Sequence, residues 1–442
     1  MFAKGKKVFA VFLSAVMLVS AFTACSESSG NSSSSDNTSS FAETYVYNSV
    51  SVNPLGREGE DGTINLKVWG PDAAQESLRE QCDEFCQIMK EYGDIKIEVI
   101  PQGEADPAAH LLTDTTVGAD VFGFACDSID KLVSAGALLE ITGMDKDFIV
   151  ENNIEGSVQA ATVNDKIFAF PETGDNSYCL IYDKSVVSDE QAKTLEGVLE
   201  ACKAQNKKFV MDAQDGYYAC MFLFTGGLTI DGFESDGFTQ KFSNYNMKTA
   251  TDTIMAFRNL FIKYRDVFVN GEVTKVVDGF KSGNVGAGID GSWNFSYAKE
   301  TLGSNAGFAV LPTIDVKGTP KQIINMFGYK LIGVNSSTKY PNTSIELAKF
   351  LTSEECQKDR AMELNWGPSN KKVAESTLIK SDAALSAILA QSENSVLQVS
   401  VSQNFWQPVA TMGNIVVDFD SEFTEKDCQE LIRQTIANVR GE

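Results

Sequence analysis

The chain has 442 residues, of which 43% are apolar and 22% charged, and this is the composition of a globular protein. Its formal net charge of −23 repels phosphate backbones and anionic headgroups, which argues against nucleic-acid binding. The single histidine, His110, lies in an apparent helix, where a surface position is expected, and none of the nine cysteines has CxxC spacing. We therefore expect no metal site, no cofactor and no histidine-dependent catalysis.

Residues 1–24 have the pattern of a secretory signal peptide. Three lysines precede an apolar stretch, Val8 to Phe22, and small residues then lead to Cys25. The cysteine resembles the lipidation site of bacterial lipoproteins, although Phe22 stands where such proteins usually have leucine. An uncleaved membrane anchor is the competing interpretation, but about 15 apolar residues are fewer than the ~20 that span a bilayer. We predict lipidation of Cys25, followed by a flexible serine-rich tether over residues 25–60.

The first elements after the tether form a βαβ pattern. Apolar and polar residues alternate from Ile64 to Trp69, as in a strand. A helical pattern then runs between Pro71 and Gly93, and a second strand pattern follows over residues 94–101. Strand, helix and strand within so short a span predict a parallel sheet with a right-handed crossover.

The alternation continues along the chain. A strand pattern over residues 119–127 precedes a helical pattern that ends near Gly136, and two strand-like halves, Ile167 to Phe170 and Tyr178 to Tyr182, flank a polar break. The later expectations are a helix at 192–205, a strand at 207–212, a helix at 216–227, a polar stretch at 231–249, a helix at 250–268 and a strand at 284–290. The chain is therefore expected to have α/β architecture with two domains.

All four tryptophans lie at the ends of expected elements. Trp69 ends the first strand, Trp293 follows the strand that ends at Asp290, Trp366 lies beside a Gly-Pro pair, and Trp406 follows a polar stretch. In open α/β sheets, ligands bind beyond the carboxyl ends of strands. One such tryptophan could cap the core, but four together favour rigid aromatic faces that suit the apolar face of a sugar ring.

Several stretches, in order, resemble a known family. They are "LKVWG", "GADVFGFACDSIDKLVSAGALLEI", "IFAFPETGDNSYCLIYDKS", "VGAGIDGSWNFSYAK", "AGFAVLPTI", "ELAKFLTSEECQKDRAMELNWGPSNKK" and "QNFWQPVATMGNIV". Together they are similar to the extracellular solute-binding proteins of ABC importers, in particular the maltose/maltodextrin-binding group. The resemblance covers about Ile64 to Arg440.

The resemblance implies a type II periplasmic-binding-protein fold, in which two α/β lobes enclose a ligand cleft and are joined by three hinge crossovers. The first lobe would comprise residues 61–174 and about 330–375, and the second residues 175–329 and about 376–442. The crossovers would fall near Thr173 to Tyr178, near Leu311 to Gly333 and near Lys371 to Ser381.

The resemblance also implies a set of ligand-binding residues, with two departures from the family pattern. Phe124 stands where maltose-type members have tryptophan and fits a core position equally well, and Asn176 replaces a cleft glutamate. Asp127 could also cap the helix that follows it. The expected ligand-binding residues are Trp69, Asp72, Phe124, Asp127, Asn176, Asp215, Tyr217, Trp293, Trp366 and Trp406.

The function implied by the resemblance is capture rather than catalysis. A monomer held by its lipid on the extracellular face of the membrane would close around a maltodextrin-type oligosaccharide and deliver it to an ABC permease. A carbohydrate-active enzyme would need a paired acid and nucleophile, which no motif proposes. Two further possibilities are a glycan-adhesion lipoprotein without transport and a member of the same family with another sugar or glycan cargo.

Overall fold

The computed structural model describes residues 53–60, 62–103, 107–243 and 245–442. The predicted signal peptide, Cys25 and most of the predicted tether lie outside the described residues. Within the described part of the chain, no helix combines the length and apolar character that a membrane span requires.

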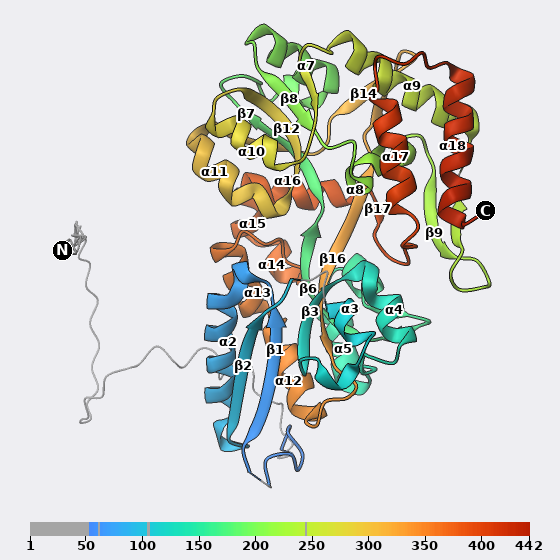
Figure 1. The fold of residues 1–442 in the computed structure, drawn as a ribbon. Coiled ribbons are helices and arrows are strands. Elements are labelled where there is room, and N and C mark those ends of the chain that lie inside the picture. Colours follow the sequence, from blue (N-terminus) through green and yellow to red (C-terminus); the bar gives the residue numbers. More distant parts are fainter. Residues whose placement is uncertain (1–52, 61, 104–106, 244) are drawn as a thin grey trace, which may run out of the picture. The chain divides into compact units, whose positions relative to one another are not determined.

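A first sheet is built around the predicted βαβ unit. β1 (Ile64–Gly70) pairs in parallel with β2 (Ile95–Pro101), and α2 (Gln75–Ile88) connects them. The sheet has the order β17-β16-β3-β1-β2, and β6 also pairs with β16 (Figure 1). Its other strands are β3 (Val121–Ala125), β6 (Ala169–Asn176), β16 (Asn325–Val334) and β17 (Ser395–Leu397). The prediction of a parallel βαβ unit is confirmed.

Helices cover this first sheet and bury its apolar side chains. Phe85 of α2 and Phe350 of α12 meet with ring centroids 5.7 Å apart, and both are buried. The helices of this part are α3 (Pro107–Leu111), α4 (Ile129–Ser134), α5 (Gly143–Asn152), α6 (Glu155–Ala160), α12 (Pro341–Leu351) and α13 (Glu354–Glu363), with a small β4–β5 hairpin (Thr162–Val163, Lys166–Ile167) between them.

A second sheet has the order β11-β8-β12-β7-β13, and its strands β7, β8 and β12 are labelled in Figure 1. Its strands are β7 (Tyr178–Asp183), β8 (Lys208–Met211), β11 (Phe268–Asn270), β12 (Val285–Gly291) and β13 (Ala306–Ala309). Its helices are α7 (Leu195–Ala204), α8 (Gly216–Thr225), α9 (Met247–Lys263), α10 (Thr274–Lys281), α11 (Phe295–Leu302), α17 (Trp406–Val416) and α18 (Glu425–Arg440). Each sheet has its own helices, so the chain forms two α/β domains. This is the architecture that the sequence patterns predicted.

The chain passes between the two sheets at three places. β6 of the first sheet leads through Ser177 directly into β7 of the second. The second passage is at the start of β16, where the chain returns from the second sheet to the first. It lies beside the first passage, because Ser177 Oγ donates a hydrogen bond to Met326 O (2.9 Å) and Asn325 Nδ2 donates to Ser177 Oγ (2.9 Å). The third passage carries α14 (Lys371–Ala374), α15 (Thr377–Ser381) and α16 (Ala383–Ser392), and α16 contacts both β6 and β7.

The polar break expected between Phe170 and Tyr178 is largely part of a strand. β6 runs continuously from Ala169 to Asn176, and Glu172, Thr173 and Asp175 within it are buried. The sequence pattern did not reveal the strand because the two carboxylates have partners distant in sequence: Gly367 N donates to Asp175 Oδ2 (2.8 Å), and Arg360 lies beside Glu172. The polar stretch at 231–249 also contains a hairpin, β9 (Thr229–Phe233) with β10 (Gln240–Ser243), and β14 (Thr313–Val316) pairs with β15 (Thr319–Gln322).

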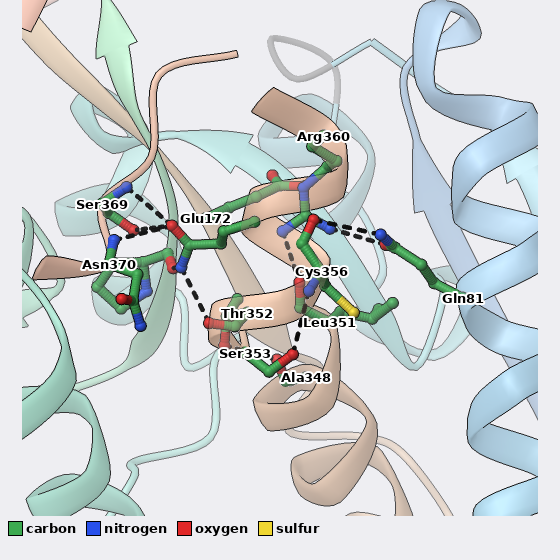
Figure 2. A network of polar contacts seen from close by, with 12 residues as sticks. Gln81, Glu172, Ala348, Leu351, Thr352, Ser353, Cys356, Arg360, Ser369 and Asn370 are labelled. Atoms are coloured by element: carbon green, nitrogen blue, oxygen red, sulfur yellow. Dashed lines mark hydrogen bonds and ion pairs between the residues drawn. The ribbon is translucent and has the colours of Figure 1, made fainter. Parts of the chain in front are cut away.

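A buried polar network holds α13 against β6 (Figure 2). Arg360 Nη1 donates to Gln81 Oε1 of α2 (2.8 Å), and Arg360 Nε lies 4.0 Å from Glu172 Oε1 of β6. Gln357 Oε1 accepts hydrogen bonds from the backbone N–H groups of Ser369 and Asn370, each at 2.8 Å. The network therefore fixes the loop after α13, which carries Trp366, to the strand that leads into the second sheet.

All eight cysteines of the described part are free thiols. Cys82 is buried and Cys86 is partly buried. Burial raises the pKa of Cys86 to about 11, so this thiol is protonated at neutral pH.

Candidate functional site

Three aromatic side chains of the second sheet domain gather at one place. The ring centroid of Tyr217 lies 6.2 Å from that of Trp293 and 6.3 Å from that of Trp406. Tyr217 and Trp406 are half-buried, whereas 43% of the Trp293 surface is exposed. We call these three rings the aromatic group. Tyr217 lies at the start of α8, Trp293 lies just after β12, and Trp406 lies at the start of α17. Their faces suit an apolar ring surface.

The end of β12 explains why Trp293 lies at the surface. A Cβ atom at Gly291 would come within 2.2 Å of the indole ring, so only glycine lets the ring lie against the strand end. Asp290 Oδ1 accepts hydrogen bonds from Gly291 N (2.7 Å) and Asn294 Nδ2 (2.9 Å), which fixes the turn on both sides of the tryptophan. Burial raises the pKa of Asp290 to about 7, against the opposing effect of these two donors.

The same turn is attached to the passage between the sheets. Ser292 Oγ donates to Asp175 O (2.7 Å), and Ser292 N donates to Ser177 O (3.1 Å). Trp293 is therefore anchored through its neighbour to β6 and the start of β7.

Close packing of α8 on α17 positions the other two rings. Asp215 is the N-cap of α8 and accepts a hydrogen bond from Tyr217 N (2.8 Å). A Cβ at Gly216 would lie 2.2 Å from Trp406 O, and one at Gly413 would lie 2.0 Å from Ala213 O. These two glycines thus permit the approach that brings Trp406 beside Tyr217.

Hydrogen bonds connect the aromatic group to the first sheet. Tyr217 OH donates to Asn176 O (2.8 Å), and Asn176 Nδ2 donates to Gln398 Oε1 (3.0 Å). Gln398 N in turn donates to Phe327 O of β16 (2.8 Å), and its side chain hydrogen-bonds to Asp127. Burial raises the pKa of Asp127, and Lys131 and the Gln398 hydrogen bond oppose this shift.

The aromatic group borders an open cavity of about 480 Å³. A second cavity of about 340 Å³ adjoins it, since Asp212, Asp215 and Glu272 line both. The first is lined by Asn176, Asp212, Asp215, Tyr217, Tyr218, Glu272, Val273, Thr274, Trp293 and Gln398. The second is lined by Asp212, Gln214, Asp215, Gly216, Glu272, Trp406, Gln407 and Ala410. Aromatic faces with a few amide and carboxylate groups are typical of a site for a polar organic ligand.

Of the ten predicted site residues, Asn176, Asp215, Tyr217, Trp293 and Trp406 line these two cavities. Asp127 adjoins them through Gln398. The assignment of these six residues to the ligand site stays a prediction.

The remaining four predicted residues are not brought to these cavities. Trp69 is half-buried with its ring 5.8 Å from that of the exposed His110, and Asp72 is exposed two residues after the end of β1. Phe124 is fully buried against Phe122, with ring centroids 5.6 Å apart, so its ring offers no face to a ligand in this conformation.

Trp366 is also buried, with 9% of its surface exposed. The ammonium group of Lys330 lies 4.4 Å from its ring centroid, a cation–π contact. These surroundings favour a core role for Phe124 and Trp366, and we leave both out of the proposed site.

Sequence reasoning missed ten residues of the two cavity walls, among them Asp212, Glu272, Tyr218 and Gln398. Asp212 directly follows β8 and Glu272 follows β11, so the strand-end rule that singled out Trp293 could have found both. Tyr218 has the helical position of a core residue and is buried, with 3% of its surface exposed, yet it lines the cavity. Gln398 follows β17, a three-residue strand that no sequence pattern indicated.

Comparisons with known proteins agree with this architecture. A structure solved with acarbose shares 25% identity, with a TM-score of 0.75, and the match covers 86% of this chain and 99% of that one. A maltodextrin-binding protein from L. casei BL23, solved without ligand, shares 20% identity at the same TM-score and coverage. A cyclo/maltodextrin-binding protein complexed with maltotetraose shares 22% identity, with a TM-score of 0.70, over 85% of this chain and 96% of that one.

These likenesses define the class of fold as the two-lobed periplasmic-binding-protein type, so the predicted fold class is confirmed. At the level of sequence, the galactooligosaccharide-binding protein of Bacillus subtilis (strain 168) is 25% identical over 356 residues, which are 78% of this chain and 82% of that protein. The family model described as bacterial extracellular solute-binding protein matches residues 83–387. The chain belongs to this family of bacterial extracellular solute-binding proteins, as its sequence motifs predicted.

Proposed function

We propose that this protein captures an oligosaccharide outside the cell and delivers it to an ABC permease. The observation that carries the proposal is the aromatic group, Trp293 with Tyr217 and Trp406, at the edge of an open cavity of about 480 Å³. Aromatic faces match the apolar faces of sugar rings, while the carboxylates and amides beside them accept and donate hydrogen bonds to sugar hydroxyls. Family membership supports capture rather than catalysis.

The proposed mechanism is closure of the two lobes around the sugar. Ligand contacts made by both lobes favour the closed arrangement and shift the population toward it. The connection from Tyr217 through Asn176 and Gln398 to Asp127 supports this mechanism, because it joins the site to the passages between the sheets.

The proposed cargo is a maltodextrin-type α-glucan. Structural neighbours named as binders of maltodextrin or complexed with maltotetraose support this choice. A galacto-oligosaccharide is the second candidate, because the relative from Bacillus subtilis is named for that cargo. We place the protein as a lipid-anchored monomer on the extracellular face of the membrane, with Cys25 as the anchor.

A thermal-shift panel tests the proposal. Maltotriose, maltotetraose and a β-linked galactotriose are each added over a concentration series. A ligand that binds only the folded state raises the melting temperature progressively with its concentration. We expect a rise for at least one of these oligosaccharides, with no release of new reducing ends during incubation. Unchanged melting temperatures across the panel, or steady hydrolysis of a bound sugar, would contradict the proposal.

A further inference from the structure

We propose that Gln398 is the positioning residue that couples the two sheet domains during ligand capture. Its side-chain amide bridges Asn176 and Asp127 at the place where the segments between the domains meet. The inference rests on the proposed function and deepens it, because it assigns the coupling to one amide group. Gln398 borders the larger cavity, but only 5% of its surface is exposed, so its amide is directed mainly to protein partners.

The two ends of the Gln398 amide have different partners. Oε1 accepts a hydrogen bond from Asn176 Nδ2 (3.0 Å), and the side chain also hydrogen-bonds to the carboxyl group of Asp127. The second contact lowers the pKa of Asp127, as a donor to a carboxylate does, so Gln398 Nε2 is the donor. The amide thus joins a donor on β6 to an acceptor that follows β3, which requires a side chain that both accepts and donates.

The backbone around Gln398 is arranged to hold this bridge. A Cβ atom at Gly328 of β16 would lie 2.4 Å from Gln398 Oε1 and 2.8 Å from Asn176 Nδ2, so only glycine leaves room for the pair. Gln398 N donates to Phe327 O (2.8 Å), and Cys126 Sγ donates to Gln398 O (2.9 Å). Gln398 is therefore bonded through its backbone and its side chain to β6, to β16 and to the end of β3.

The segment that follows Gln398 is attached to elements of both sheet domains. Ser400 Oγ donates to Asp130 Oδ2 of α4 (2.7 Å), in the first domain. Ser400 O accepts from Nε2 of the fully buried Gln240 (3.2 Å), which lies on β10 in the hairpin that contacts α18 of the second domain. The segment then enters α17, which begins with Trp406. A displacement of Gln398 would therefore reach an aromatic residue of the proposed site.

The ionisable groups around the amide make its neutrality important. Burial raises the pKa of Asp127, and the ammonium group of Lys131 and the Gln398 hydrogen bond oppose this shift. Burial also raises the pKa of the Cys126 thiol and of the Tyr217 hydroxyl, so both keep their protons. A second carboxyl group in place of the amide would therefore face Asp127 directly, and the two would compete for one proton.

Gln398→Glu, which replaces the amide by a carboxyl group of the same shape, tests the inference. Maltotriose, or β-linked galactotriose if the thermal-shift panel selects it, is titrated by calorimetry, and each affinity is divided by that of the unaltered protein at the same pH. At about pH 9 the variant should bind roughly tenfold more weakly, because its carboxylate repels Asp127 and donates no hydrogen bond. At about pH 5 one of the two carboxyl groups is protonated and donates again, so the affinity should return to within about threefold.

Asp127→Asn provides a second test at high pH. The new amide can donate to a carboxylate at position 398, so adding Gln398→Glu to Asp127→Asn should change the affinity by less than about threefold at about pH 9. Melting temperatures without ligand give the same comparison, since Asp127→Asn should also reverse any loss of folding caused by Gln398→Glu. Gln205→Glu makes the same change at an exposed position after α7 and is the matched control, which should bind like the unaltered protein at both pH values.

Three results would overturn the inference. They are full affinity of Gln398→Glu at about pH 9, an equal loss at both pH values, and an equal loss with and without Asp127→Asn. In each of them the unaltered protein still binds sugar, so the proposed function stands and only the role of Gln398 is removed. Failure of the proposed function gives a different result, because the unaltered protein then binds neither sugar and the thermal-shift panel is also negative.

Discussion

Trp293 is the residue on which the proposed site depends most. An exposed tryptophan at a strand end has little structural purpose, yet its surroundings are arranged to hold it there. Gly291 leaves room for the ring, Asp290 fixes the turn, and Ser292 ties the turn to β6. A side chain that is held in place and 43% exposed is what a stacking surface requires.

Trp293→Ala should leave the stability of the unliganded protein nearly unchanged. Truncation of an exposed side chain alters the free energy of unfolding by about 0.5 kcal/mol. Trp366→Ala is the comparison, because Trp366 is buried and its loss should cost roughly 3 to 5 kcal/mol. Urea unfolding of both variants without ligand measures the difference. A loss of stability in Trp293→Ala as large as that in Trp366→Ala would show that Trp293 is a core cap.

Asp290 should make stability depend on pH. The pKa of Asp290 is raised from an ordinary value of 3.8 to about 7, so the folded state binds the proton of this carboxyl group more tightly than the unfolded chain does. The resulting stabilisation is fully present below about pH 4 and is lost as the pH rises through 7. Compared with Asp290→Asn, the unaltered protein should lose up to about 3 kcal/mol of unfolding free energy between pH 5 and pH 8. Parallel curves for the two proteins across this range would contradict the buried, protonated carboxyl.

The sequence could identify the aromatic site residues but not all their partners. Trp293 and Trp406 stand out as tryptophans at element ends, and the family resemblance added Tyr217. Phe124 and Trp366 could not be separated from core residues, because burial depends on neighbours distant in the chain, such as Lys330. The sequence did not indicate that Gln398 belongs to the site, since a single glutamine in a polar segment has the same pattern whether or not it contacts a ligand.

At the scale of elements, the packing of α8 on α17 decides where two of the three rings lie. The two helices approach so closely that Gly216 and Gly413 face backbone carbonyl oxygens of the opposite segment. Contact through backbone rather than through side chains leaves no room for adjustment. Any added atom must therefore move one helix and the aromatic residue at its start.

Gly413→Ala tests this packing. The new Cβ would meet Ala213 O at 2.0 Å, so the variant should lose roughly 1 to 3 kcal/mol of unfolding free energy and bind sugar more weakly through displacement of Trp406. Thr411→Ala, an exposed position of the same helix, is the control and should change stability by less than about 0.5 kcal/mol. Thermal unfolding and titration of both variants give the answer. Unimpaired stability of Gly413→Ala would mean that the helices can separate without cost.

Elements with a regular apolar pattern were predictable, and elements stabilised by distant polar partners were not. The alternation from Ile64 to Trp69 indicated β1, because alternating apolar and polar residues place one face of a strand toward the core and the other toward solvent. The sequence pattern predicted a break between Phe170 and Tyr178 because this stretch is polar. In the structure, Glu172 and Asp175 are buried within β6 through contacts with α13 and with the loop at Gly367. No local pattern contains that information.

At the scale of the whole molecule, the proposed function requires a domain held at the membrane. The proposed anchor, Cys25, lies outside the described residues, and no helix within them is suited to span a bilayer. A lipid on Cys25 followed by a serine-rich tether would keep the sugar site near a permease while leaving the domain free to close.

Cys25→Ala should release the protein from the membrane. Fractionation of cells that express the variant should move it from washed membranes to the soluble or secreted fraction, while its sugar binding stays normal. Ser28→Ala, a change within the tether, controls for an effect of substitution near the processing site. Full retention of Cys25→Ala in washed membranes would contradict the lipid anchor.

Calorimetric titration of Trp293→Ala with the tightest-binding oligosaccharide of the panel tests the central claim most directly. Tyr297→Ala is titrated in parallel, because Tyr297 is an exposed aromatic residue of α11 that lines neither cavity. The unaltered protein should bind one sugar per chain, Tyr297→Ala should match it, and Trp293→Ala should lose roughly 1.5 to 4 kcal/mol of binding free energy. Equal affinity of Trp293→Ala and the unaltered protein would contradict the claim that this tryptophan is the surface on which the sugar stacks.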